Sequence, residues 1–296
     1  MINAHPGLPE FDYIRLASAK ETSRFLAEHQ GEALPFLGGT DIFVRMRDGV
    51  WKGKYLVDVK GLDGTNQILF DPDKGLTLGA AVNMNRVINS PEIQEHYPLL
   101  VESARTVASY QLRTRATIAG NLCNASPAGD TTGACIVYDG SLSIHGVNGV
   151  RQQPLSTFFR GPGQTALEVG DIAIGLKFPL PPRNHAARYI KLGRNAAGDL
   201  AIVGVTVLGY RDRSTPSGYR FRIALASVAP TPLEPIEAEL ILNNKPINQE
   251  SISQAANAAM EACSPIDDVR GSARYRKIMV RNLTQKALSE VWGKIK

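Results

Sequence analysis

The sequence Thr117-Ile-Ala-Gly-Asn-Leu-Cys-Asn-Ala-Ser-Pro-Ala-Gly-Asp130 is short, dense in small residues and ends in a single acid. Thr117 and Ile118 are expected to end a strand. Ala119 and Gly120 then allow the backbone to approach a ligand closely, because glycine has no Cβ and alanine carries only a methyl group. Backbone N–H groups on such a loop can hold an anion, usually phosphate, without a lysine. The stretch is therefore a candidate phosphate-binding loop.

The polar residues of this stretch suit the same purpose. Asn121 and Asn124 supply compact hydrogen-bonding groups, and Asp130 is a candidate acceptor for a ribose hydroxyl or an amino group. Taken alone, the stretch is equally compatible with a surface loop rich in turn-forming residues. A second feature is needed to decide between the two readings.

That second feature is an apolar run that ends in a glycine pair. Its residues, all candidates for binding the same ligand, are Leu34, Pro35, Phe36, Leu37, Gly38, Gly39, Thr40 and Asp41. The run predicts a short buried strand followed by a tight turn. Two such loops in one chain suggest a pyrophosphate held from both sides. Arg45 and Arg47 follow, and either neutralise phosphate or face water, of which the second is favoured.

Familiar nucleotide and catalytic motifs do not occur in this sequence. Neither loop carries the Gly-Lys-Ser or Gly-Lys-Thr of a P-loop, and neither is a G-x-G-x-x-G between a strand and a helix. No histidine has a zinc-like spacing to another histidine or to a cysteine, and no Gly-x-Ser-x-Gly elbow is present. We therefore expect no metal and no catalytic residue in this chain.

Composition places the chain among ordinary globular proteins. It has 296 residues, 43% of them hydrophobic and 21% charged, which is enough for two domains. The net charge of +5 comes from scattered residues without a polybasic run, so no nucleic-acid partner is expected. Three cysteines do not form a disulfide framework, and no apolar run is long enough to span a membrane. These features predict a cytoplasmic protein.

Hydrophobic patterns and capping signals outline an α+β chain of two domains. Strands are expected at residues 55–59, 76–82, 171–179, 200–208, 220–228 and 239–242. Helices are expected to begin at Ser18, Ser90, Pro98, Thr131, Ser251 and Ser272. Pro179, Pro181 and Pro182 stiffen a linker that we take as the domain boundary.

The two loops together resemble the FAD pyrophosphate loops of the flavin-binding medium subunit of molybdenum hydroxylases. This family includes the flavoproteins of carbon monoxide dehydrogenase and the FAD domain of xanthine dehydrogenase. The residues that carry the resemblance are Leu37-Gly-Gly-Thr-Asp41 and Thr117-Ile-Ala-Gly-Asn121, and Ala119 stands where the family usually has glycine. The block Lys191-Leu-Gly-Arg194 with Asp199 and Ala201, and the final helix with Tyr275 and Arg276, resemble the family in the same order.

The resemblance implies a fold and a division of the chain. Residues 1–179 would form a two-part FAD-binding domain of the vanillyl-alcohol-oxidase (PCMH) type, with subdomains at about 1–60 and 61–179. Residues 185–296 would form a small α+β domain of the CO dehydrogenase flavoprotein type. The two glycine loops would hold the FAD pyrophosphate, Asp130 would bind the adenosine portion, and Lys191 would approach the flavin.

The resemblance also implies a function that is shared with other chains. An oxidoreductase subunit of this kind takes electrons from a small [2Fe–2S] subunit and passes them through FAD to an acceptor such as NAD, a quinone or oxygen. The substrate reacts at a molybdenum cofactor in a large subunit, and the complex is expected to be a dimer of heterotrimers. Two alternatives remain open: a self-contained FAD-dependent oxidoreductase of the same fold, and a non-enzymatic module that has lost the flavin.

Overall fold

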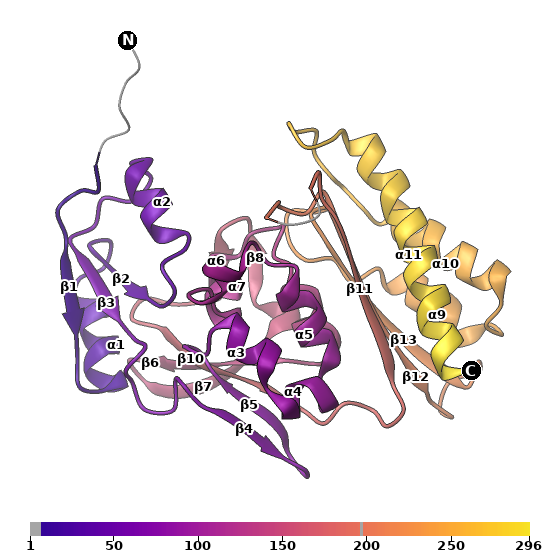
Figure 1. Cartoon of the computed structure of the whole chain (residues 1–296), viewed down its shortest axis with the longest axis horizontal. Helices are drawn as coiled ribbons and strands as arrows, with labels where there is room; N and C mark the ends of the chain where they lie inside the picture. Colours follow the sequence, from indigo (N-terminus) through magenta and orange to yellow (C-terminus); the bar gives the residue numbers. More distant parts are fainter. Residues whose placement is uncertain (1–6, 196–197) are drawn as a thin grey trace.

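The computed structural model describes residues 7–195 and 198–296. Residues 1–6 of the expected first domain and residues 196–197 of the block at 191–201 lie outside the described part. The described chain forms sheets of three, five and three strands, which follow one another along the long axis of the molecule, and a small two-stranded sheet (Figure 1). No helix of the described residues is long and apolar enough to cross a membrane.

The first sheet is parallel, with strand order β1-β3-β2. The strands of this sheet and the helices that connect them are, in chain order, β1 (Asp12–Arg15), α1 (Ala19–Glu28), β2 (Ala33–Phe36), α2 (Ile42–Arg47) and β3 (Tyr55–Asp58). Helix α1 begins at the expected cap, because the Ser18 hydroxyl accepts a hydrogen bond from the Glu21 N–H at 3.2 Å. The first glycine loop follows β2 directly, so it lies at the carboxyl end of a parallel strand, where open α/β sheets bind ligands.

The second sheet is antiparallel, with strand order β4-β5-β10-β6-β7. Its strands are β4 (Ile68–Asp71), β5 (Gly75–Gly79), β6 (Ser141–Gly146), β7 (Gly149–Pro154) and β10 (Ile172–Phe178), and β8 (Phe159–Gly161) pairs with β9 (Gln164–Thr165) nearby. A group of short helices packs beside this sheet: α3 (Met84–Asn89), α4 (Pro91–His96), α5 (Pro98–Arg105), α6 (Tyr110–Arg113), α7 (Ile118–Asn124) and α8 (Thr132–Val137). The main core of the chain lies between these helices and the sheet, around buried residues such as Leu78, Leu100 and Leu142.

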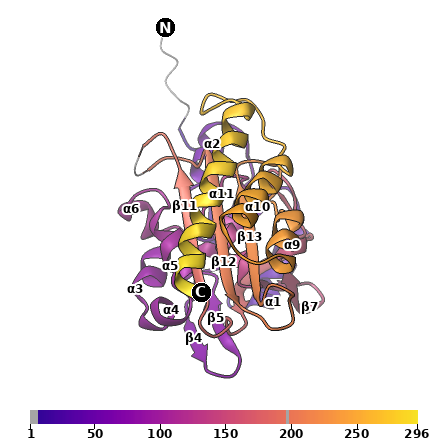
Figure 2. The same cartoon turned by 90° about the vertical axis from the view of Figure 1, so that its right-hand side faces the viewer.

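The third sheet has helices on both of its faces. Its strands are β11 (Ala186–Leu192), β12 (Val203–Arg211) and β13 (Tyr219–Ala226), and α9 (Ile236–Asn244), α10 (Gln249–Glu261) and α11 (Ala273–Ile295) complete the chain. The last three helices lie on one side of this sheet (Figures 1 and 2), whereas α5 and α8 contact its strands from the first part of the chain. Strand β12 is therefore buried almost throughout, which explains its unbroken sequence of small and apolar residues.

Three expectations about local structure are wrong. Helix α10 does not begin at Ser251, because Asn248 is its N-cap and Ser251 is the third helical residue of the capping box. Thr117 does not end a strand: it is the N-cap of α7, and its hydroxyl accepts a hydrogen bond from the Gly120 N–H at 2.9 Å. Residues 239–242 form no strand either, because they lie within α9. Ala238 and Leu242 are both fully buried at the i, i+4 spacing of a helix, and the short apolar run around them did not distinguish the two structures.

Helix α9 closes the open edge of the third sheet. The side chain of Glu239 accepts a hydrogen bond from the Ile223 N–H at 2.7 Å, and Asn243 accepts one from the Phe221 N–H at 3.2 Å. These N–H groups belong to edge strand β13 and would otherwise lack partners. Glu239 is only 9% exposed, and burial raises the pKa of its carboxyl to about 7.

This raised pKa predicts a pH-dependent stability. Below pH 7 the Glu239 carboxyl stays mostly protonated in the folded chain, whereas in the unfolded chain it ionises above its ordinary pKa of 4.5. Its contribution to stability is therefore complete at pH 4 and is lost as the pH rises through 7. Between pH 4 and pH 8 the wild type should lose about 3 kcal/mol in its free energy of unfolding relative to Glu239→Gln, which keeps the acceptor oxygen and cannot ionise. Urea unfolding of both proteins at the two pH values measures the difference. Parallel pH profiles would contradict the assignment.

Candidate functional site

A cavity of about 580 Å³ lies where the first sheet meets the helices of the second. The residues predicted from the two loops that line it are Leu34, Pro35, Phe36, Leu37, Gly38, Gly39, Thr40, Asp41, Thr117, Gly120, Asn121, Asn124 and Asp130. The structure thus brings together two segments that are about eighty residues apart in sequence. Ala119 does not line the cavity, since it is 1% exposed and packs in the main core. Lys191 also lies outside the lining.

The first wall of the cavity is the turn after β2. Gly39 has a φ of +77°, a conformation that glycine adopts without strain. Gly38 is in close contact with the chain on the opposite side: a Cβ at this position would lie 2.2 Å from the carbonyl oxygen of Arg115. Only a residue without a side chain allows this approach. The two walls therefore touch at Gly38 and diverge from there to form the cavity.

The second wall is made by α7 and the segments on either side of it. Asn121 is fixed by a hydrogen bond from the Thr131 hydroxyl to its side-chain oxygen, at 2.7 Å. Cys123 also lines the cavity, and burial raises the pKa of its thiol to about 12, so the group stays neutral. Asn121 and Cys123 therefore present uncharged groups to the cavity.

Asp130 is joined to the C-terminal part of the chain by buried contacts. Its two carboxylate oxygens accept hydrogen bonds from the Tyr189 hydroxyl at 2.7 Å and from the Lys191 ammonium at 2.8 Å. Lys191 donates another to the carbonyl of Thr106 at 3.0 Å. Burial raises the pKa of Asp130, and the Lys191 ammonium opposes this effect. Both side-chain oxygens of Asp130 thus have protein partners.

Sequence reasoning missed Tyr189 and Arg113. Tyr189 precedes Lys191 by two residues on β11, so the alternation of a strand places both on one face. Arg113 on α6 donates to the carbonyls of Val107 and Ala108, at 2.8 and 3.3 Å, and holds Ala108 at a φ of +43°. Val107 and Ala108 both line the cavity. The sequence gives no local signal for this role of Arg113.

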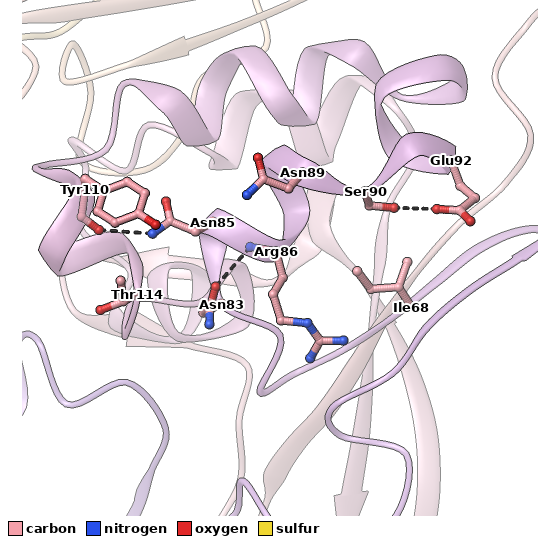
Figure 3. A pocket seen from close by; sticks show the side chains of 9 residues that line it. All are labelled: Ile68, Asn83, Asn85, Arg86, Asn89, Ser90, Glu92, Tyr110 and Thr114. Atoms are coloured by element: carbon pink, nitrogen blue, oxygen red, sulfur yellow. Dashed lines mark hydrogen bonds between the residues drawn. The ribbon is translucent and has the colours of Figure 1, made fainter.

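A second cavity, of about 510 Å³, is shallow and lies beside α3 and α6 (Figure 3). Several of its polar side chains already bond one another or the backbone: Asn85 donates to the Tyr110 carbonyl at 3.1 Å, and Ser90 donates to Glu92 at 2.7 Å. Arg86 bonds Asn66. Since these groups are engaged, the first cavity is the better candidate for a ligand.

The first cavity suits an extended cofactor with a phosphate group. Its volume is in the range typical of cofactor sites. Its walls combine a glycine turn that brings bare backbone to the surface, compact amides and apolar side chains. These residues fit the FAD expected from the sequence.

Comparison with known proteins identifies the class to which this fold and site belong. Residues 9–181 match the FAD binding domain in molybdopterin dehydrogenase, and residues 188–291 match the CO dehydrogenase flavoprotein C-terminal domain. The chain belongs to this family of flavoproteins. The expected fold class, a PCMH-type FAD-binding domain followed by a CO dehydrogenase flavoprotein-like domain, is thereby confirmed.

Individual relatives match along nearly their whole length. The medium chain of carbon monoxide dehydrogenase from Hydrogenophaga pseudoflava is 30% identical over 97% of this chain and 98% of the relative. A putative xanthine dehydrogenase FAD-binding subunit of Escherichia coli is 29% identical over 94% of both chains. A solved structure of the Hydrogenophaga pseudoflava enzyme has a TM-score of 0.92 at 30% identity, covering 97% of this chain and 99% of its own.

Proposed function

We propose that this chain is the FAD-binding electron-transfer subunit of a heteromeric molybdenum hydroxylase. The observation that carries the proposal is the cavity itself, in which both glycine loops of the family lie on facing walls. Its relatives are medium chains and FAD-binding subunits of dehydrogenases along nearly their full length. Bound FAD would supply the ability to accept and release electrons one or two at a time.

The residues proposed to hold FAD are those of the two loops. The turn at residues 34–41 and the start of α7 at residues 117–121 would contact the pyrophosphate, with Asn124 beside them. Asp130 and Lys191 also belong to the proposed site, but their proposed role differs from the direct contact with FAD that the sequence suggested. Because they are bonded to each other and to Tyr189, we propose that they fix the shape of the cavity wall.

The division of the chain and the composition of the complex are also proposals. We propose an FAD-binding domain at residues 1–179, with subdomains at about 1–60 and 61–179, and a second domain at residues 185–296. The partners would be a large molybdenum-cofactor subunit and a small [2Fe–2S] subunit, arranged as a dimer of heterotrimers in the cytoplasm. Electrons would enter from the small subunit and leave to an external acceptor.

The absorption spectrum of the chain tests this proposal. The chain purified alone should show flavin bands, whereas molybdenum and iron should appear only when it is purified with its native partners. Turnover should require the partners, because the proposed role of this chain is to relay electrons between centres on other chains through FAD. Full turnover by the lone chain would instead support a self-contained oxidoreductase. Absence of flavin from both preparations would refute the proposal.

A further inference from the structure

Arg45 has an exceptional position among the residues that line the FAD cavity. Of the described lining residues, it is the one with a positively charged side chain. The same lining includes five carboxylates: Asp41, Asp130, Glu168, Asp171 and Asp199. The net charge of the cavity lining therefore depends on which of these carboxylates form ion pairs with other residues.

Three of the five carboxylates are paired with cations that lie outside the lining. Asp130 bonds Lys191, Asp171 bonds Arg151 and Asp199 bonds Arg194. Asp41 and Glu168 form no ion pair within the described chain. These two unpaired carboxylates oppose the entry of a doubly negative pyrophosphate, and a cation in the lining would offset that repulsion in addition to the backbone N–H groups of the loops.

The guanidinium of Arg45 is held where it can act as that cation. Its Nη2 donates to the side-chain oxygen of Asn124 at 2.6 Å, and Asn124 in turn donates to Asp41 at 3.2 Å. These hydrogen bonds link α2, which follows the glycine turn, to α7, which forms the opposite wall of the cavity. None of the ion pairs among the described residues includes Arg45, so its guanidinium has no direct carboxylate partner there.

We propose that Arg45 supplies the counter-charge for the pyrophosphate of FAD in this chain. The inference rests on the proposed function and extends it to a residue outside the two glycine loops. A guanidinium binds phosphate oxygens with two parallel N–H donors, and the bond to Asn124 orients the group beforehand. The sequence alone favoured solvent for both Arg45 and Arg47, and both are exposed in the structure. Arg45 differs from Arg47 because it also lines the cavity.

Three variants separate the charge of Arg45 from its role as a bridge between helices. Arg45→Gln keeps an N–H donor for Asn124 but removes the charge, and Arg45→Lys keeps the charge. Arg47→Gln is the matched control, since Arg47 is exposed on the same helix. Each full-length protein, stripped of flavin, is titrated with FAD, with ADP as a probe of the pyrophosphate, and with riboflavin, which has no phosphate.

The expected results are specific to phosphate. Arg45→Gln should bind FAD and ADP about tenfold more weakly or worse, with riboflavin affinity unchanged, because a hydrogen bond to a charged group is lost. Its FAD affinity should also depend less on salt than that of the wild type. Arg45→Lys should recover part of the loss, and Arg47→Gln should match the wild type.

Other outcomes would overturn the inference. Equal FAD affinity in wild type and Arg45→Gln would show that the pyrophosphate finds its counter-charge elsewhere. An equal loss for FAD and riboflavin would show that Arg45 acts only as a bridge between α2 and α7. A wild type that binds no flavin would instead refute the proposed function itself, so the two failures are distinguishable.

Discussion

Gly38→Ala is expected to yield a protein that has lost its FAD and is less stable by about 3 kcal/mol. The added Cβ would lie 2.2 Å from the carbonyl oxygen of Arg115 and 2.8 Å from its carbonyl carbon. Both are backbone atoms, so no side-chain rotation relieves the overlap. The turn after β2 and the segment before α7 would have to separate by roughly 1 Å to reach ordinary contact. Because they form the two walls of the cavity, the site would widen where the pyrophosphate is proposed to bind.

The flavin-to-protein absorbance ratio and urea unfolding measure the two effects of Gly38→Ala. Gly293→Ala in α11 is the control, since a Cβ there meets nothing within 4 Å and the helix favours alanine. This variant should keep its FAD and its stability. A normal flavin content in Gly38→Ala would contradict the contact between the walls.

The role of Gly38 illustrates what can be predicted from the sequence and what requires the structure. The sequence predicted that the glycine pair belongs to a ligand-binding turn, and the structure places both glycines in the lining of the cavity. The structure adds a reason for glycine at position 38, the contact with Arg115, which is about eighty residues further along the chain. A local sequence pattern indicates that a position needs glycine. Only the tertiary packing shows which neighbouring atom leaves no room for a side chain there.

The same distinction explains the errors. Thr117 was expected to end a strand, because a threonine followed by an apolar residue suits a strand as well as it suits a helix N-cap. Residues 239–242 were expected in a strand because a short apolar run fits both structures, and only the packing of Ala238 and Leu242 decides. Helices with clear caps, such as those beginning after Ser18 and Ser272, were predicted correctly.

The candidate site shows where sequence information ends. The two loops were found because glycines and compact polar residues cluster in sequence. Tyr189 and Arg113 were missed because each acts through one long-range or backbone contact, with Asp130 and with the Val107 carbonyl respectively. Residues that only position a site are therefore harder to predict from the sequence than residues that line it.

Lys191→Met is expected to lower the free energy of unfolding by about 3–5 kcal/mol. The side chains of Asp130 and Lys191 are 8% and 12% exposed, and their ion pair at 2.8 Å joins the segment after α7 to strand β11. Methionine leaves the Asp130 carboxylate buried with the Tyr189 hydroxyl alone as a side-chain partner. Since Asp130 and Thr106 belong to the first part of the chain and Lys191 to the second, the loss should appear as a weaker contact between the two parts.

The double variant Asp130→Asn/Lys191→Met distinguishes positioning from a direct effect on the flavin. With no buried charge left unpaired, it should recover much of the stability lost in Lys191→Met, although a buried ion pair contributes little net stability itself. If Lys191 acts only by fixing the cavity wall, FAD affinity and the flavin reduction potential should recover together with stability. If its charge acts on the flavin directly, the reduction potential of the double variant should differ from that of the wild type even where stability and FAD affinity have recovered. A loss below about 1 kcal/mol in Lys191→Met would contradict the buried pair, since exposed ion pairs contribute no more than this.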